Sequence, residues 1–273
     1  MAFQSKLDAI IQKNNSLVCV GLDSDISKIP ESFQQKEHLQ FEFNKAIIDA
    51  TVDLVCCYKP NSAFYEARGD LGIKELKMTC DYIKGIYPNV PIILDAKRAD
   101  IGNTNNGYVQ FAYNYLGVDA VTINPYLGQE AIKPFLENQN KGVIILCKTS
   151  NQGSGEFQDL FVGDKKLYEI VAEKVANEWN TLENCSLVVG ATYPEELHTV
   201  RSIVGDMTLL IPGIGTQGGD VEKTIKAGIN SKNEGLIINA SRSILFASGS
   251  DDFAEKAREK TEVLKNEINQ YRQ

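Results

Sequence analysis

Eight short apolar runs recur along the chain, and they constrain its fold more than any other feature. The runs lie at residues 17–23, 53–60, 90–97, 119–125, 142–150, 186–192, 208–215 and 235–241. Because each run is continuously apolar instead of alternating with polar residues, it predicts a strand that is buried on both faces, as in a parallel sheet. The segments between the runs have helical spacing. Phe43, Ile47 and Ala50, for example, share one face of a predicted helix.

Strand and helix therefore alternate along all 273 residues, without a linker or a low-complexity segment between them. Eight such units in about 250 residues are what a (β/α)8 TIM barrel requires. We expect an α/β protein with a single TIM-barrel domain over residues 1–273 and an active site at the C-terminal ends of the strands. A doubly wound open sheet is the alternative that the same pattern leaves open.

The composition narrows the possible functions. A net charge of -8 argues against non-specific binding to nucleic acid or an anionic membrane, so an anionic substrate needs a local cluster of cations. No stretch approaches the roughly 18 apolar residues of a membrane span, and residues 1–15 indicate an amphipathic helix instead of a signal peptide. With two histidines and no Cys-x-x-Cys spacing, we expect no metal site. We expect reduced core thiols in a cytoplasmic protein at Cys19, Cys56, Cys57, Cys80, Cys147 and Cys185.

Polar, charged or glycine-rich residues follow nearly every predicted strand at its C-terminal end. Examples are Asp23, Lys59, Asp95 and Asn124, together with the segment 148–150. In a barrel these ends meet at one mouth, where the active sites of this fold lie. A polar loop explains one such ending, but it does not explain almost all of them. The pattern therefore predicts a functional site at the mouth.

The stretch "LDAKRADIGNT" at residues 94–104 concentrates charge at the end of the third strand. Because side chains two residues apart on a strand share a face, Asp95 and Lys97 are expected to point together into the mouth and Arg98 away from it. A structural ion pair is the alternative for Asp95 and Lys97. Asp100 precedes a helix expected to begin near Ile101, so a helix N-cap is its alternative.

The last two strands are followed by segments suited to phosphate. The seventh ends in a glycine-rich loop that lets backbone amides approach an anion, with Gly213, Gly215, Gly218 and Gly219. After the eighth, Ser241 and Arg242 open a predicted helix, whose N-terminus favours anions, and a guanidinium suits bidentate contact with phosphate. A solvent-exposed arginine is the alternative for Arg242.

The stretch at 94–104 resembles the D-x-K-x-x-D-I-x-x-T signature of the orotidine 5'-phosphate decarboxylases. "CVGLD" (19–23), "YKPNSAFYE" (58–66), "PGIGTQGGD" (212–220) and "NASRSI" (239–244) are similar to further motifs of this family, in the same order. "KPNSAFYE" and "TINPYLG" are similar to the wording of its type 2 branch. The D-x-K-x-x-D element alone also occurs in a related sugar-phosphate decarboxylase.

This resemblance implies a carboxy-lyase of de novo pyrimidine biosynthesis that removes carbon dioxide from C6 of orotidine monophosphate and leaves uridine monophosphate, without a cofactor. It implies that Lys97 protonates C6, that Asp95 lies against the departing carboxylate, and that Lys59 and Asp100 complete an alternating array. It also implies a cytoplasmic homodimer in which the neighbouring subunit supplies Asp100 and Thr104.

The resemblance implies further substrate contacts as well. Ribose hydroxyls would be held by Asp23 and Lys59, and the pyrimidine amide by Ser150. Pro212 would pack on the ring, Gln217 would bridge phosphate and base, and Ser241 and Arg242 would hold the phosphate. Asn61 and Asn124 are additional candidates, and residues 150–160 could form a lid. Shorter members of the family have glycine where this chain has Ser241, a change that keeps a backbone donor.

Two other functions remain as alternatives. A metal-dependent sugar-phosphate decarboxylase of the same structural group would need further acidic ligands at the strand ends. A catalytically silent barrel that binds nucleotides would have no use for four buried charges at one site.

Overall fold

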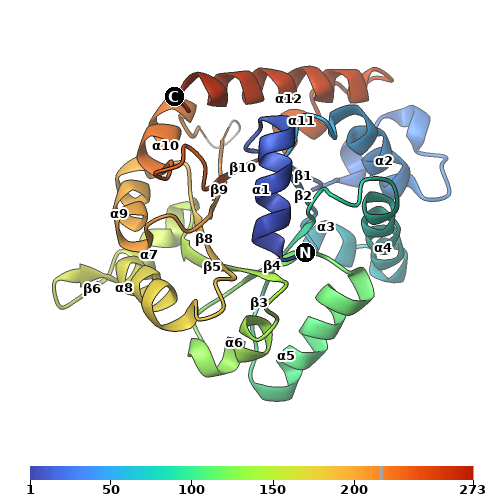
Figure 1. The fold of residues 1–273 in the computed structure, drawn as a ribbon. Helices are drawn as coiled ribbons and strands as arrows, with labels where there is room; N and C mark the ends of the chain where they lie inside the picture. Colours follow the sequence, from blue (N-terminus) through green and yellow to red (C-terminus); the bar gives the residue numbers. More distant parts are fainter. Residues whose placement is uncertain (215–217, 273) are drawn as a thin grey trace.

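The computed structural model describes residues 1–214 and 218–272 (Figure 1). Eight parallel strands form one sheet in the order β2-β1-β10-β9-β8-β5-β4-β3. Parallel bridges between Tyr58 and Ile92 and between Asn61 and Asp95 join the two ends of this order, β2 and β3. The predicted (β/α)8 barrel is confirmed, and the doubly wound open sheet is wrong. The barrel strands are β1 (Val18–Gly21), β2 (Cys57–Lys59), β3 (Ile93–Arg98), β4 (Ala120–Ile123), β5 (Gly142–Lys148), β8 (Cys185–Val189), β9 (Leu209–Pro212) and β10 (Leu236–Ala240).

Each predicted apolar run overlaps one of these strands, and the strands are mostly shorter than the runs. The apolar side chains of these strands are buried. They lie inside the barrel or between the strands and the helices, which surround the barrel in Figure 1. This double burial is why the runs lack polar alternation. A short antiparallel hairpin, β6 (Phe161–Val162) and β7 (Lys165–Lys166), projects from the barrel after β5.

The helices form the outer layer. They are α1 (Phe3–Asn14), α2 (Leu39–Thr51), α3 (Ala63–Glu66), α4 (Gly69–Ile86), α5 (Gly102–Val109), α6 (Gly128–Leu136), α7 (Gly155–Gln158), α8 (Leu167–Lys174), α9 (Pro194–Val204), α10 (Val221–Gly228), α11 (Arg242–Leu245) and α12 (Phe253–Gln270). Two of them continue into π-helical segments, α5 into Gln110–Leu116 and α8 into Val175–Trp179. Short 3-10 turns lie at Ile26–Lys28, Glu31–Phe33 and Gln152–Ser154.

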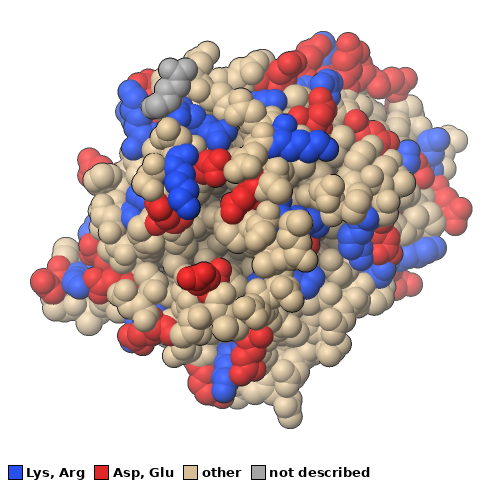
Figure 2. Space-filling model, in the orientation of Figure 1, with Lys and Arg blue, Asp and Glu red and all other residues tan. Residues whose placement is uncertain are grey.

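Helix α1 covers the end of the barrel where the strands begin. It crosses the ring of strands in Figure 1, and the Phe3 amide donates to the Asn140 carbonyl at 3.1 Å. A Cβ at Gly142, the first residue of β5, would lie 2.3 Å from the Phe3 ring, so this close approach needs glycine. Acidic and basic side chains are intermingled over this face (Figure 2). With one end covered by α1, the opposite end, where the strands finish, is left to form a site.

Two further expectations concern burial and membranes. All six cysteines are buried and free. Within residues 1–214 and 218–272, none of the helices combines the length and the apolar character needed to span a membrane.

Candidate active site

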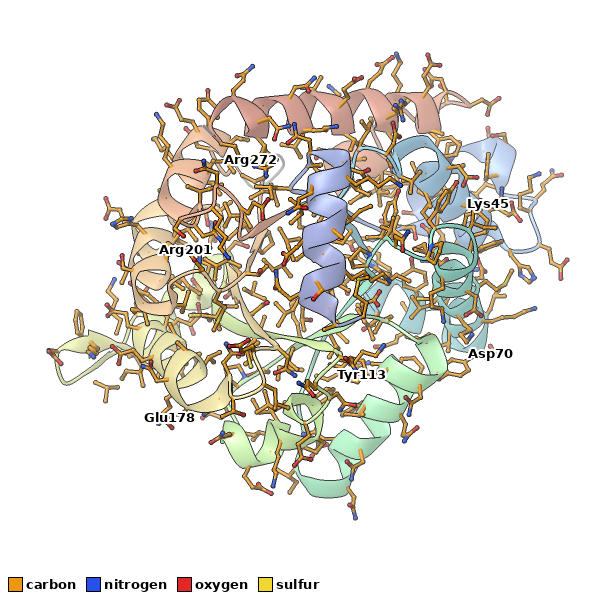
Figure 3. All side chains as sticks on the ribbon, in the orientation of Figure 1. Lys45, Asp70, Tyr113, Glu178, Arg201 and Arg272 are labelled. Atoms are coloured by element: carbon orange, nitrogen blue, oxygen red, sulfur yellow. The ribbon has the colours of Figure 1, made fainter. Side chains whose placement is uncertain are left out.

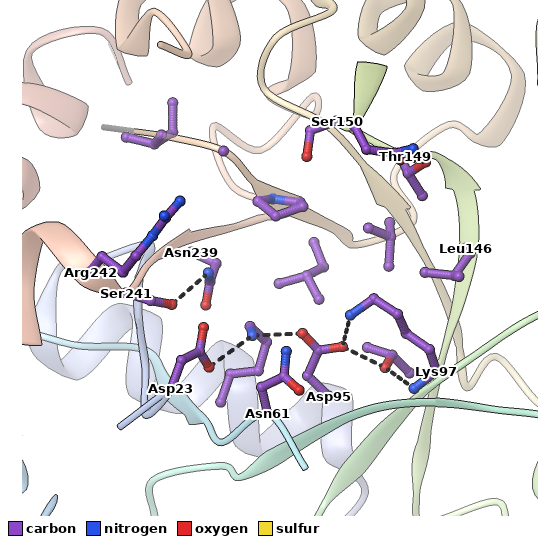
Figure 4. Close-up of a pocket in the computed structure, with 18 of the residues that line it drawn as sticks. Asp23, Asn61, Asp95, Lys97, Leu146, Thr149, Ser150, Asn239, Ser241 and Arg242 are labelled. Atoms are coloured by element: carbon purple, nitrogen blue, oxygen red, sulfur yellow. Dashed lines mark hydrogen bonds and ion pairs between the residues drawn. The ribbon is translucent and has the colours of Figure 1, made fainter. Parts of the chain in front are cut away.

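A cavity of about 560 Å³ opens at the C-terminal ends of the strands (Figure 4). Every strand of the barrel, or the residues that directly follow it, contributes to its lining. Polar side chains gather at its floor and rim. The polar residues that line it are Asp23, Lys59, Asn61, Asp95, Lys97, Thr122, Thr149, Ser150, Asn151, Gln158, Asn239, Ser241 and Arg242.

Four charged side chains, from β2, β3 and the segment after β1, form a row of alternating sign on the cavity floor (Figure 4). Lys59 Nζ lies 2.9 Å from Asp95 Oδ2 and 3.9 Å from Asp23 Oδ1. Lys97 Nζ lies 2.7 Å from the other oxygen of the Asp95 carboxylate, Oδ1. The side chain of Lys59 is 3% exposed and that of Lys97 is 49% exposed, so one cation is buried and the other reaches into the open cavity.

The row shifts the ionisation of its members. Burial would by itself raise the pKa of Asp95, but the ammonium groups of Lys59 and Lys97 outweigh it and hold that pKa well below its usual value. Burial would likewise lower the pKa of Lys59, but the Asp23 and Asp95 carboxylates raise that pKa above its usual value. The aspartate and the buried lysine are therefore both charged at neutral pH.

Strand β3 is irregular where it carries this chemistry. Leu94 pairs with Val121 and Arg98 with Ile123, so β3 has more residues than β4 across the same interval. Lys97 has a φ of 47°, in the left-handed region. The predicted common direction of Asp95 and Lys97 holds, but simple strand alternation is not its cause. A bulge and a side chain of β4 produce it, because Thr122 Oγ1 accepts a hydrogen bond from the Lys97 amide at 2.9 Å.

Arg98 and Asp100 lie outside the cavity lining. Arg98 pairs with Glu66 and lies over the Tyr108 ring, at 5.3 Å from its centroid, in agreement with its predicted direction away from the mouth. Asp100 Oδ1 accepts from the Ile101 amide at 2.6 Å. The N-cap interpretation of Asp100 is wrong, because α5 begins at Gly102 and its N-cap position is Ile101. Thr104 is exposed on α5.

At the end of the cavity formed by β9 and β10, Pro212, Ser241 and Arg242 line the wall (Figure 4). A Cβ at Gly21 would lie 1.9 Å from Ser241 Oγ, so β1 and the segment after β10 approach closely only because residue 21 is glycine. The helix that Arg242 begins, α11, is a single turn, so it offers only a weak helix dipole beside the guanidinium. Gln217 and Gly215 lie outside the described residues.

Two asparagine candidates are separated by the structure. Asn61 lines the cavity, and its Oδ1 accepts from the Ala63 amide at 3.1 Å. Asn124 is exposed and lies outside the lining, where its Oδ1 accepts from the Tyr126 amide at 3.0 Å. Asn124 is thus a turn residue after β4.

The segment after β5 is fastened to the barrel rim. Ser150 lines the cavity beside Thr149, whose amide donates to Gln158 Oε1 at 2.9 Å. Lys148 is fully buried, and its Nζ donates to both oxygens of Asp159 at 2.9 and 2.8 Å. These bonds hold both ends of residues 150–160, the predicted lid segment, next to the mouth.

Sequence reasoning missed two residues of the site. Thr122 lies within an apolar run and begins the quoted stretch "TINPYLG", but the resemblance assigns it no role. Asn239 lies in a stretch quoted for phosphate binding, but it faces the cavity itself, and its Nδ2 donates to Ser241 Oγ at 3.4 Å. Among the described residues, no group of three or more His, Cys, Asp or Glu side chains is arranged to hold a metal ion.

The chain is similar in sequence and structure to proteins of one family. The model of the family described as "Orotidine 5'-phosphate decarboxylase / HUMPS family" matches residues 16–259. The orotidine 5'-phosphate decarboxylase of Ralstonia nicotianae is 46% identical over 272 residues, which cover 100% of each chain. The structure of Leishmania donovani OMP decarboxylase is similar with a TM-score of 0.87 and 36% identity, over 100% of this chain and 99% of that one. Leishmania donovani UMP synthase is similar with a TM-score of 0.89 and 37% identity, over 100% of this chain and 57% of that one.

Proposed function

The chain belongs to the orotidine 5'-phosphate decarboxylase / HUMPS family, and we propose that it converts orotidine 5'-phosphate to UMP and carbon dioxide with Lys97 as the proton donor. The observation that carries this proposal is the row Asp23–Lys59–Asp95–Lys97 on the floor of the cavity. The reaction is a carboxy-lyase step of pyrimidine biosynthesis. We propose residues 1–273 as one catalytic domain and the cytoplasm as its location, where free thiols stay reduced.

The chemistry requires stabilisation of negative charge that develops at C6 when carbon dioxide leaves. The Lys97 ammonium reaches into the cavity and is fixed by Asp95, so it can stabilise this charge without reorganising and then protonate the carbon. Two unit charges 4 Å apart interact by about 4 kcal/mol at an effective dielectric of 20. The Asp95 carboxylate would lie against the departing carboxylate, and the ion pair with Lys59 favours its charged form.

The remaining substrate groups have candidate partners along the cavity. Asp23 Oδ1 is a buried atom that accepts no hydrogen bond from any described residue, which suits a ribose hydroxyl held jointly with Lys59. Arg242 and Ser241 would hold the phosphate together with Gln217. Ser150, Asn61 and Pro212 would contact the pyrimidine. Asn124 lies outside the cavity lining and would instead hold the turn after β4.

The proposal is tested by following the loss of orotate ultraviolet absorbance when purified protein is mixed with orotidine 5'-phosphate. Wild type should consume the substrate, and Lys97→Ala should lower kcat by at least about 10³-fold, because it removes both the acid and the electrostatic stabilisation. Lys174→Ala is a matched control, since Lys174 is also 49% exposed and ion-paired, to Glu178, on the outer helix α8. An inactive wild type would disprove the proposed function, and an active Lys97→Ala would disprove the role of Lys97.

The metal-dependent alternative is separated by the same assay. We propose that no cofactor takes part, so an excess of EDTA should leave the rate of the wild type unchanged. A rate that collapses with EDTA and returns with magnesium would instead favour the metal-dependent sugar-phosphate chemistry of the wider family.

We also propose a homodimer in which Asp100 and Thr104 enter the cavity of the partner subunit. Both residues lie outside the lining of their own cavity. Ile101 is 62% exposed, Tyr126 84% and Leu127 48%, as expected of a surface that a second copy covers. Mixing inactive Asp100→Ala with inactive Lys97→Ala should restore activity, because one site of the hybrid dimer is then intact. No recovery after subunit exchange would show that Asp100 acts within its own chain.

A further inference from the structure

The backbone of Lys97 is strained. Its φ of 47° lies in the left-handed region, which side chains other than glycine, asparagine and aspartate rarely occupy. Such strain persists only where the surrounding structure enforces it. The bulge in β3 also removes the regular ladder between Leu94 and Arg98, so the Lys97 amide needs an acceptor from elsewhere.

Thr122 of β4 supplies that acceptor and completes a closed ring of hydrogen bonds (Figure 4). Its Oγ1 accepts from the Lys97 amide at 2.9 Å and lies 2.9 Å from Asp95 Oδ1. Because the amide can only donate and the carboxylate can only accept, the Thr122 hydroxyl must donate to Asp95. The same Asp95 Oδ1 accepts from Lys97 Nζ at 2.7 Å, so backbone, hydroxyl, carboxylate and ammonium form one ring.

We propose that Thr122 is a positioning residue for the decarboxylation, which fixes both the backbone of Lys97 and the carboxylate oxygen that its ammonium contacts. This inference rests on the proposed function and adds a residue to it. Thr122 is 1% exposed, so its hydroxyl is largely shielded from solvent. It occupies Asp95 Oδ1 and leaves Oδ2 to Lys59, so it also sets the orientation of the carboxylate within the row.

The ring explains why a lysine with a half-exposed side chain can serve as a precise proton donor. A long side chain in solvent has many rotamers, and displacement of a reacting group by 1 Å can lower a rate by about 10²-fold. In this ring the chain is held at its backbone end by Thr122 and at its ammonium end by Asp95. Loss of the hydroxyl frees both ends at once.

The kinetic test uses Thr122→Val, which keeps the shape and removes the hydroxyl, and Thr122→Ser, which keeps the hydroxyl. We expect Thr122→Val to lower kcat for orotidine 5'-phosphate by about 10- to 10²-fold with little change in KM, and Thr122→Ser to restore most of kcat. Thr208→Val is the matched control, because Thr208 is also buried and donates to Gln4 Oε1 at 2.9 Å, but at the other end of the barrel. Thr122→Val with kcat within twofold of wild type would overturn the inference.

A structural measurement keeps this inference separate from the proposed function. In crystals of Thr122→Val, we expect Lys97 to leave the left-handed conformation or its Nζ to move away from Asp95 Oδ1. Thr122→Ser should keep both features. An inactive wild type would end the proposed function, yet the conformation of Lys97 in these crystals would still decide the role of Thr122. An unchanged Lys97 in Thr122→Val would overturn it.

Discussion

The two ends of the barrel both hold cations, but they satisfy them in opposite ways. At the mouth, Lys59 is surrounded by carboxylates, Asp95 at 2.9 Å and Asp23 at 3.9 Å. At the other end, Arg201 (Figure 3) donates to backbone carbonyls, those of Gly228, Met207 and Gly235 at 2.7, 2.7 and 2.9 Å among them. The partners at the mouth carry charge and face a cavity, whereas the partners of Arg201 are neutral and lie inside the packed structure.

This difference separates the energetic roles of the two ends. Arg201 donates to carbonyls at the end of α10 and in the segments before β9 and β10, so one planar fork ties several backbone segments together and stabilises the fold. A row of charges at the mouth gains less, because desolvation offsets much of the attraction between buried ions. The row therefore serves the electrostatic field in the cavity. Variants at the mouth should lose activity, and stability as well where a buried charge is left unpaired, whereas variants at the opposite end should lose stability alone.

The largest effect is expected for Lys59→Met at the mouth. It leaves the buried Asp95 carboxylate with Lys97 alone of its two paired lysines and removes the cation nearest Asp23, so the free energy of unfolding should fall by about 3–5 kcal/mol and activity should be lost. Chemical denaturation and the decarboxylase assay measure both. Lys97→Met is the comparison within the row. It should abolish activity but change stability by only about 1 kcal/mol, because its side chain is half exposed and Asp95 keeps Lys59. Equal losses of stability in the two variants would contradict the division of the row into buried and open cations.

A smaller effect, on stability alone, is expected for Arg201→Met. The free energy of unfolding should fall by about 2–3 kcal/mol, because several carbonyls lose a charged donor. The values of kcat and KM should stay within twofold of wild type, since Arg201 lies at the opposite end from the cavity. Arg201→Lys should recover only part of the stability, because an ammonium cannot reproduce the planar fork. A loss of activity in the still-folded Arg201→Met would break the separation between the two ends.

The fold could be predicted from the sequence because it follows from local pattern. A parallel strand covered on both faces is apolar throughout, and every such run overlaps a strand of the barrel. The charged residues of the site were also visible, because Asp23, Lys59 and Asp95 stand where apolar runs end. Their convergence followed from the barrel itself, which brings all strand ends to one mouth.

Features that depend on contacts between distant residues could not be predicted in this way. The conformation of Lys97 depends on Thr122, which lies 25 residues later and resembles any threonine within a strand. The pairing of Lys148 with Asp159 is hidden in a polar loop, and Asn124 carries the same polar signal as Asn61 although only Asn61 reaches the cavity. In each case the position is set by tertiary contacts that local periodicity does not encode.

The smallest expected effect is a pH dependence that distinguishes charged from neutral partners. The pKa of Asp95 is lowered in the folded protein, so its contribution to stability is complete above its unfolded value of about 3.9 and is lost as the pH falls toward the folded value. The pKa of Lys59 is raised, so its contribution is complete below its unfolded value of about 10.4 and is lost only as the pH rises through the folded value. Between about pH 4 and pH 10, Asp95 and Lys59 should therefore contribute a constant amount to the free energy of unfolding.

Below pH 4 the gap in unfolding free energy between wild type and Asp95→Asn should therefore narrow, by about 1 kcal/mol at pH 3 relative to pH 6. Urea denaturation of both proteins at each pH measures the gap. The gap between wild type and Arg201→Met should change less over the same range, because the carbonyls that Arg201 contacts do not titrate and the nearby Asp206 carboxylate is exposed to solvent. A gap for Asp95→Asn that is equally flat would mean that the carboxylate gains little from its two lysines, and the mouth would then resemble the opposite end in its energetics.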